Sequence, residues 1–216
     1  MQEFVCVTGI ILKQMPVGEY DRRITLLTKE RGKLSAFARG ARKQGSRFGA
    51  ATNPFCFGIF KLYEGRTAYT VSDVEIQNFF ESLMKDYIGA CYGMYFAEIA
   101  DYYTRENNDE SRMLKLLYQT LRALCSPSLQ NELIKCIYEL KAIEVNGEYP
   151  GVPSDISLLE STVYAMNYIE KSPIEKLYTF AVSGTVLKEL QTVAAEYCRR
   201  FMDCKFKSLE ILKTLC

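Results

Sequence analysis

The hydrophobic pattern of this 216-residue chain changes its period near Asn78, and that change limits the folds open to it. Before Asn78, runs of β-branched and aromatic residues alternate with turns rich in Gly, Pro, Asn and Asp, as is typical of β-strands. The expected strands cover residues 4–12, 24–30, 33–41, 54–65 and 68–76. Five such strands without a long helix among them favour a small closed or partly open barrel.

Beyond Asn78 the apolar residues recur with the period of an α-helix. The first stripe lies within 83–103 and contains Leu83, Tyr87, Cys91, Met94, Tyr95, Ile99 and Tyr102. Further stripes predict helices over 114–124, 133–143 and 186–201, and residues 208–216 follow as a short tail. This second part of the chain is therefore expected to be all-helical.

The stretch NGEYPGVPSD, residues 146–155, is the clearest long linker. Two later Ser-Glu pairs have the spacing of a capping box, which begins a helix: Ser157 with Glu160, and Ser172 with Glu175. We therefore expect an α+β protein with two domains. A five-stranded barrel occupies residues 1–78, and a helical domain occupies residues 79–216.

Charge divides along the same boundary. Residues 1–80 carry a net charge of +5 and residues 81–216 a net charge of −4, although the whole chain is at +1. A basic barrel indicates an acidic partner, such as nucleic acid or an acidic protein. The start of the chain lacks the pattern of a signal peptide, and no apolar run is long enough to span a membrane, so we expect a cytoplasmic protein.

The residue types present argue against catalysis and metal binding. The chain has no His, which removes imidazole bases and His-ligated metals. Its eight Cys are scattered without a C-x-x-C pair, as expected of reduced structural thiols. The adjacent acids Asp109 and Glu110 lie in a polar turn. We expect no enzyme activity, no metal and no cofactor.

One stretch stands out: no Asp or Glu occurs between Glu30 and Glu64, and residues 33–55 hold five basic side chains. Gly40 and Gly45 have the spacing of a phosphate-binding P-loop. However, Ser46 and Arg47 follow where Lys and then Ser or Thr are required, and we expect no helix after them. The remaining interpretations are a nucleic-acid-binding surface and a solvated basic loop.

Strand alternation gives the nucleic-acid interpretation a geometry. Leu34, Ala36 and Ala38 would line the barrel, so Lys33, Ser35, Phe37 and Arg39 would point outward. Phe37 would stack on a base while the cations hold phosphates, unless a helix covers its ring. The candidate DNA-binding residues are Lys33, Phe37, Arg39, Arg42, Lys43, Arg47, Arg22 and Tyr69. For Arg22 an ion pair with Asp21 or Glu19, and for Tyr69 core packing, are equal alternatives.

Several motifs carry a resemblance to a known family. They are GEYDR (18–22), TLLTKERGKL (25–34), ARGAR (38–42), SRFGA (46–50), PF (54–55) and RRFMDCKFKSLEIL (199–212). In this order and spacing they resemble the RecO family of bacterial DNA repair proteins. The resemblance implies an OB-fold barrel and a helical domain without enzymatic turnover. It also implies binding to single- and double-stranded DNA, strand annealing, and contacts with RecR and single-strand-binding protein that help to load RecA.

The sequence departs from that family in one respect. Many members carry a four-cysteine zinc module, and the corresponding region here is the cysteine-free linker 146–155, so we expect no zinc. The acidic, apolar-ended tail of single-strand-binding protein would need an apolar pocket rimmed by cations. Candidate residues are Arg199, Arg200, Lys205 and Lys207, beside Phe201 and Phe206, although a solvated helix end explains the charges equally well.

Two other classes of function stay open from the sequence. The chain could be a helical scaffold whose basic barrel binds acidic proteins, or an enzyme of unrecognised type. Binding of an oligonucleotide separates the first of these from a DNA-binding mediator. Turnover assays address the second. Five neutralised phosphates would give a log–log salt slope of about −3 to −4 on single strands.

Overall fold

Five strands form a closed barrel in the order β1-β2-β3-β5-β4. In the computed structural model, which describes residues 4–65 and 68–215, the strands are β1 (Phe4–Val17), β2 (Asp21–Thr28), β3 (Gly32–Ala38), β4 (Phe57–Glu64) and β5 (Tyr69–Asn78). All neighbours are antiparallel except β3 and β5, which pair in parallel through two residues of each strand. This is the OB-fold barrel that the sequence predicted.

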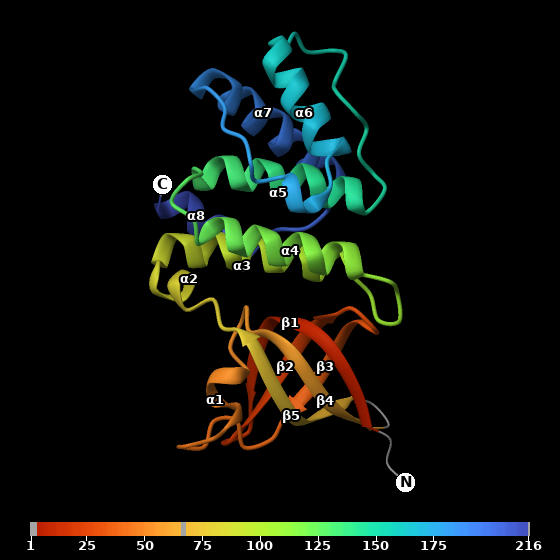
Figure 1. Cartoon of the computed structure of the whole chain (residues 1–216), viewed down its shortest axis with the longest axis vertical. Helices are drawn as coiled ribbons and strands as arrows, with labels where there is room; N and C mark the ends of the chain where they lie inside the picture. The colour runs from red at the N-terminus through yellow and green to blue at the C-terminus, as the bar shows by residue number, and fades with distance from the viewer. Residues whose placement is uncertain (1–3, 66–67, 216) are drawn as a thin grey trace.

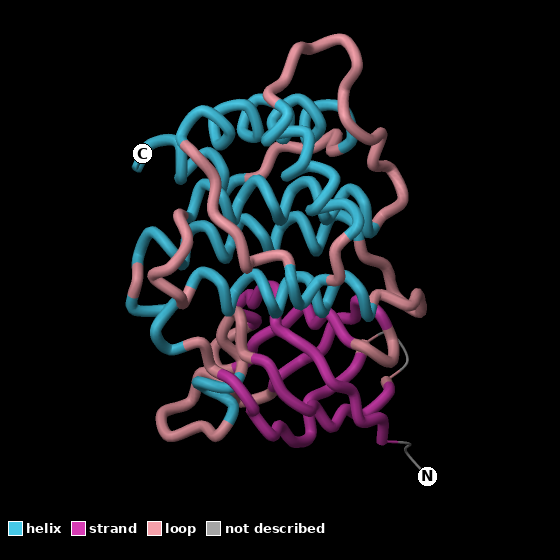
Figure 2. Tube along the Cα trace, turned by 45° about the horizontal axis from the view of Figure 1, so that its top comes forward, coloured by secondary structure: helices cyan, strands magenta, loops and turns pink. Residues whose placement is uncertain are grey.

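The helices stack in layers on one side of the barrel (Figures 1 and 2). They are α2 (Glu81–Lys85), α3 (Tyr87–Tyr103), α4 (Ser111–Leu124), α5 (Asn131–Val145), α6 (Glu160–Lys171), the 3-10 turn η1 (Ile174–Lys176), α7 (Gly184–Phe201) and α8 (Lys207–Leu215). Figure 1 shows α3 and α4 next to the barrel, α5 beyond them, and α6 and α7 furthest from it. The fold class predicted from the sequence is confirmed.

The first expected helix is broken in two. Asp86 has an extended backbone (φ −93°, ψ 104°), so α2 ends before it and α3 begins after it. The break turns Tyr87 out of the expected apolar stripe, and its side chain is 66% exposed. The other stripe residues are buried or half-buried in α2 and α3. The prediction that the stripe residues face the core is therefore confirmed for all of them except Tyr87, which lies at the break.

The expected helix caps were wrong. α6 begins at Glu160 after Leu159, and η1 begins after Pro173, both without a side-chain cap. A side-chain cap occurs instead at α7, where the Ser183 hydroxyl accepts a hydrogen bond from the Val186 amide at 3.4 Å.

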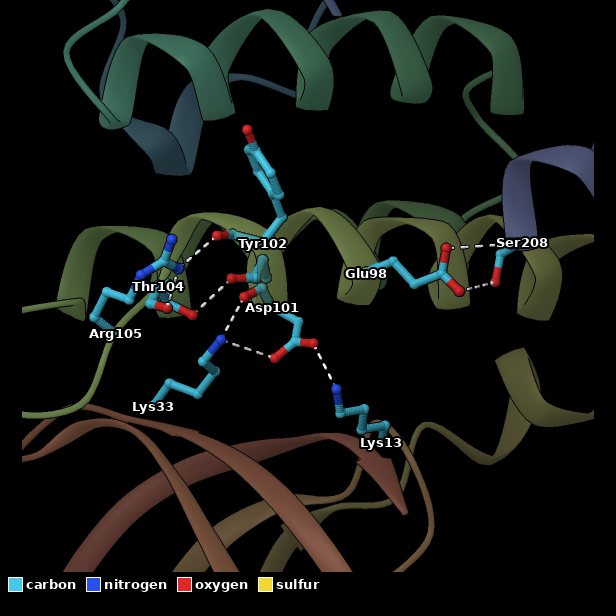
Figure 3. Close-up of polar contacts among 9 residues, drawn as sticks. Lys13, Lys33, Glu98, Asp101, Tyr102, Thr104, Arg105 and Ser208 are labelled. Atoms are coloured by element: carbon cyan, nitrogen blue, oxygen red, sulfur yellow. Dashed lines mark hydrogen bonds and ion pairs between the residues drawn. The ribbon is translucent and has the colours of Figure 1, made fainter. Parts of the chain in front are cut away.

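The expected tail is also helical and forms α8. Glu98 of α3 accepts hydrogen bonds from the Ser208 amide (3.2 Å) and hydroxyl (3.0 Å), as Figure 3 shows. This carboxylate satisfies an amide in the first turn of α8, where the helix itself offers no acceptor. The tail therefore becomes a helix that packs on α3.

The barrel and the helices share one apolar core. Ile10, Leu12 and Leu27 of the barrel belong to the same buried cluster as the inner faces of α3, α4, α5 and α7. A second cluster, which includes Ile11, Leu26 and Phe60, fills the inside of the barrel. β1 is therefore buried on both faces around residues 9–12.

A segment of the helical domain also pairs with the barrel. The Lys33 amide donates to the Arg105 carbonyl and the Asn107 amide donates to the Arg31 carbonyl, each at 2.9 Å. Gly32 and Glu106 form an antiparallel bridge between these bonds. The segment pairs with the start of β3, ahead of the residues that pair with β5. The domains are thus joined by backbone hydrogen bonds as well as by the core.

Candidate nucleic-acid interface

The outward face of β3 is as the alternation predicted. Leu34, Ala36 and Ala38 are buried in the barrel, and Phe37 is half-buried on the opposite face. Phe37 is not among the side chains that pack against either apolar core. Its ring therefore lies on the outer surface of the barrel and is not covered by the helical domain.

The loop that follows β3 is held against the turn between β1 and β2. The Asp21 carboxylate accepts the Gly40 amide at 2.7 Å, and the Tyr20 carbonyl accepts the Arg42 amide at 2.8 Å. Gly40 (φ 67°) and Gly45 (φ 73°) take left-handed backbone conformations that favour glycine. These contacts fix the backbone from which the basic side chains of the loop project.

Three cations of this loop are exposed and have no carboxylate partner among the described residues: Arg39, Arg42 and Lys43. We call them the loop cations. The Arg42 guanidinium donates to the Gly18 carbonyl at 3.0 Å, and the Lys43 ammonium lies 5.3 Å from the centroid of the Tyr20 ring. Neither neighbour neutralises the charge, so the loop presents a positive surface.

Arg47 lies at the far end of the loop and is partly neutralised. Its guanidinium is 3.3 Å from the Asp73 carboxylate and donates to the Ser72 carbonyl at 2.6 Å. Both charged side chains are more than 60% exposed, so water screens the pair and it is weak. Arg47 can therefore exchange this partner for a phosphate, although it ties the loop to β5 in this structure.

A short helix, α1 (Phe48–Ala51), follows the loop where the sequence analysis expected none. It has four residues, and Arg47 in its N-cap position makes no side-chain cap. A helix this short aligns too few peptide dipoles to hold a phosphate at its end. The P-loop interpretation therefore gains nothing from this correction, since the Lys and Ser or Thr it needs are still missing.

Lys33 was expected to face DNA, but it faces the helical domain instead. Its ammonium lies 3.0 Å from the Asp101 carboxylate and donates to the Asp101 carbonyl at 2.5 Å, while Lys13 contacts the same carboxylate at 2.7 Å (Figure 3). Burial raises the pKa of Asp101, but the hydrogen bonds from Lys13 and Lys33 outweigh it and the pKa falls below its usual value. We call these three residues the lysine clamp. The outward direction was right, but α3 covers this end of β3.

Two more candidates have structural roles. Arg22 donates to the Gly49 carbonyl (2.7 Å), the Thr52 hydroxyl (2.9 Å) and the Asn53 side chain (3.1 Å), and none of the ion pairs found among the described residues involves it. The ion pair with Asp21 or Glu19, which was the alternative to DNA binding, is therefore not formed. Tyr69 is only 7% exposed and packs in the barrel core. Of the two alternatives for this residue, the structure therefore has core packing, and the buried ring is not placed to stack on a base.

A hollow of about 460 Å³ lies where the barrel meets the end of α3. Four cations and two acids line it: Lys13, Arg23, Lys33, Arg105, Asp101 and Glu106. The Arg23 side chain reaches it from β2 and donates to the Ser35 hydroxyl at 2.7 Å. Local sequence patterns could not predict this hollow, because it joins residues about 70 to 90 positions apart.

The apolar pocket expected beside the cations near the C-terminus depended on Phe201 and Phe206. Phe206 is only 8% exposed, since its ring packs against Tyr95 and Tyr102. Arg199 pairs with Glu196 at 2.6 Å, and Arg200 lies 5.1 Å from the Phe201 ring centroid. Lys205 and Lys207 are exposed. One of the two aromatic side chains expected to line the pocket is therefore buried in the core.

Cys56 and Cys136 are buried like small apolar side chains and Cys91 and Cys198 are half-buried, whereas Cys6, Cys125 and Cys204 are exposed. The seven described cysteines are free, and burial raises the pKa of Cys56 to about 11 and of Cys136 to about 12. Cys216 lies outside the described residues. Within 4–65 and 68–215, no cluster of three or more His, Cys, Asp or Glu side chains could hold a metal. No helix in that part of the chain is long and apolar enough to cross a membrane.

The barrel order and the appended helices define an OB-fold protein with a helical domain, whose basic loop lies at the surface. Two family models match the chain: Recombination protein O N terminal over residues 1–80, and Recombination protein O C terminal over residues 84–156. The chain belongs to the recombination protein O (RecO) family.

Similar curated proteins span nearly the whole chain. The DNA repair protein RecO of Acetivibrio thermocellus is 28% identical over 98% of this chain and 97% of its own length. Those of Alkaliphilus metalliredigens (27%, covering 96% and 98%) and Clostridium novyi (26%, covering 96% and 93%) are similar to it as well. The first comparison extends over 244 positions, more than the 216 residues here, so that relative has residues without a counterpart in this chain.

Proposed function

We propose that this chain is a DNA repair and recombination mediator without catalytic turnover. It binds single- and double-stranded DNA, promotes annealing of complementary strands, and helps to load RecA on DNA coated by single-strand-binding protein. RecR and single-strand-binding protein are its protein partners, in the bacterial cytoplasm at the nucleoid. The family and the names of the relatives support the repair role.

One observation carries the DNA-binding proposal. Arg39, Arg42 and Lys43 are exposed without carboxylate partners, beside the half-exposed ring of Phe37, on an OB-fold barrel. Cations attract phosphates and an aromatic ring stacks on unpaired bases, which together form a binding surface for single strands. Duplex DNA would use the cations alone, because its bases are already stacked.

Annealing follows from the same surface. Two complementary strands repel each other through their phosphates, and a positive surface that holds both lowers that repulsion. The loop cations contribute +3 within five residues of chain. The loop that carries them is anchored at Asp21 and Tyr20. Both DNA strands would therefore meet the same, fixed set of cations.

The test is fluorescence anisotropy of a labelled single-stranded oligonucleotide across a salt series. Changing Arg39, Arg42 and Lys43 together to Ala removes three phosphate contacts. We expect weaker binding and a log–log salt slope that is shallower by about 2, since each neutralised phosphate contributes about 0.7 on single strands. The same variant should slow annealing of complementary strands coated with single-strand-binding protein.

The matched control removes the same charge elsewhere. Lys171, Lys176 and Lys188 are exposed in the helical domain, far along the chain from the barrel. Changing these three to Ala should leave affinity and slope close to those of the parent protein. Equal effects of the two triple variants would show that net charge alone governs binding, and the assignment to the loop would be abandoned.

For the acidic tail of single-strand-binding protein, a second surface fits better than the C-terminal cations. A hollow of about 500 Å³ between the barrel and α4 has an apolar floor of Phe57, Leu114 and Tyr118. Lys29, Arg112 and Lys115 line it as well. Arg112 pairs with Glu144 at 3.0 Å and Lys115 pairs with Glu175, so Lys29 carries the free charge.

A labelled acidic peptide with an apolar C-terminal residue distinguishes the two surfaces. Lys29→Glu should weaken peptide binding if the tail occupies the hollow beside α4. Arg200→Glu should weaken it if the tail binds near the C-terminal cations Arg199, Arg200, Lys205 and Lys207. Binding that survives both substitutions would mean that neither surface receives the tail.

A further inference from the structure

A row of side chains crosses the outer face of the barrel at right angles to its strands. The register places Arg23 opposite Phe37, Phe37 opposite Thr70, Thr70 opposite Tyr63, and Tyr63 opposite Phe4. Residues directly opposite one another in paired strands point to the same face of the sheet. That face is the outer one, because the residues on both sides of Phe37 and of Thr70 are buried.

Three of these side chains are aromatic rings that neither core uses. We call Phe37, Tyr63 and Phe4 the aromatic row. Phe4 is 45% exposed, and its ring centroid lies 4.0 Å from that of Tyr63 at an interplanar angle of 36°. None of the three packs against the two buried clusters of the described residues. Phe37 and Tyr63 are half-buried, so all three rings reach the surface, and aligned surface rings are typical of a binding surface.

We propose that the aromatic row extends the single-strand contact from Phe37 to Phe4 and stacks unpaired nucleic-acid bases. The inference rests on the proposed function and adds the path of the strand across the barrel. Neighbouring strands lie about 4.8 Å apart, so Phe37 and Phe4 are separated by about 14 Å. A stacked nucleic-acid strand advances about 3.4 Å per nucleotide, so the row accommodates about four nucleotides.

Cations at both ends of the row favour a polyanion over an apolar protein partner, and the rings between them fit the bases of a nucleic acid, which an acidic protein lacks. Arg23 and Arg39 are exposed at the Phe37 end, and Lys61 is exposed at the Phe4 end. The Lys61 ammonium lies 4.5 Å from the centroid of the Phe4 ring, where it would move to a phosphate as a base takes its place. Asp73, opposite Lys61 in the register, is an acidic side chain on this face, and its weak pair with Arg47 neutralises it only in part.

The chain contains no Trp, so one introduced Trp reports on the row alone. Phe4→Trp places it in the row, and Phe79→Trp places it at an aromatic position of similar exposure, 40%, beside α2. Titration with an oligothymidylate of about 12 nucleotides should quench the emission of the first variant and leave that of the second unchanged. Anisotropy on the same samples measures binding itself. Bound oligonucleotide without quenching at Phe4→Trp would overturn the inference.

Substitutions give an independent measurement. Tyr63→Ala should weaken single-strand binding by about 5- to 150-fold, the effect of losing one stacked base, with an unchanged salt slope. Lys61→Ala should instead reduce the slope by about 0.7. The control is Tyr164→Ala, at a 72% exposed tyrosine of α6. Unchanged affinity in Tyr63→Ala rejects the row, whereas parent protein that binds no oligonucleotide rejects the proposed function and the row with it.

Discussion

Two buried aromatic residues have left-handed backbone conformations that bulky side chains seldom adopt. Phe55 has φ 70° and Phe80 has φ 50°, yet they are only 1% and 4% exposed. Each conformation costs about 1–3 kcal/mol. Burial offsets the cost, because both rings belong to the core shared with the helices. Phe55 fits only because Gly93 has no side chain: a Cβ there would lie 2.9 Å from the Phe55 ring.

Two substitutions at Phe55 separate burial from backbone strain. Phe55→Ala should lower the free energy of unfolding by about 3–5 kcal/mol, since it empties a packed site. Phe55→Gly removes the same ring but also relieves the left-handed conformation, so it should be less destabilising by about 1 kcal/mol. Urea denaturation measures both. If Phe55→Gly is the less stable variant, the strain assigned to this residue is absent.

At the scale of single residues, the sequence predicted which way a side chain points better than it predicted which groups surround that side chain. Alternation correctly placed Leu34 inside the barrel and Phe37 outside it. The same rule pointed Lys33 outward, but it could not show that α3 would cover that end of the strand. For Arg22 and Tyr69 the alternatives could be resolved only once the partners, which come from other strands and loops, were known.

At the scale of elements, one carboxylate of α3 forms ion pairs with two strands of the barrel, in addition to the contacts of the shared core. Asp101 accepts both lysines of the lysine clamp, from β1 and from the start of β3. Its pKa is lowered in the folded protein, because the hydrogen bonds from the two lysines outweigh the effect of burial. The stability that it contributes is therefore complete above the pKa of Asp in the unfolded chain, and it is lost as the pH falls through the lower folded value.

Asp101→Asn should remove this dependence on pH. Both pairs are partly exposed, so we expect a loss of about 1 kcal/mol at neutral pH. The difference in unfolding free energy between parent and variant should shrink as the pH falls below about 4. Urea titrations at pH 7 and in acid measure it, with Asp73→Asn, at the exposed pair with Arg47, as a control. A difference that persists undiminished in acid would contradict the role of Asp101.

The elements themselves were largely readable from the sequence, and their ends were not. All five strands and the helices α4, α5 and α7 occur where the periodicity placed them. The break at Asp86 and the start of α6 depend on packing between helices, which local spacing does not encode. α8 was missed because Glu98, which caps it, lies 110 residues earlier in the chain.

At the scale of the whole molecule, the two expected domains share one core. The sequence did carry a signal of this: Ile10, Ile11 and Leu12 are consecutive apolar residues, as in strands buried on both faces. Ile11 faces the barrel interior, while Ile10 and Leu12 face the helices. A boundary near residue 78 therefore describes the order of elements along the chain, and the core continues across it.

A shared core predicts one cooperative unfolding transition. A Trp introduced at Phe4 reports on the barrel, and one introduced at Tyr164 reports on the outer helices, because both positions are exposed and tolerate the change. The two reporters should give the same urea midpoint and the same m-value within error. Separate midpoints, with the helices or the barrel unfolding first, would show that the interface does not couple them.

The bridge between Gly32 and Glu106 has a consequence for solubility. β3 pairs with β5 through only two residues, so the rest of its outer edge would otherwise offer free amides and carbonyls to a strand from another molecule. The segment around Glu106 pairs with the first residues of that edge, through the hydrogen bonds of Lys33 and Asn107. The helical domain thereby shortens the edge that is open to aggregation between β3 and β5, where two residues of each strand pair.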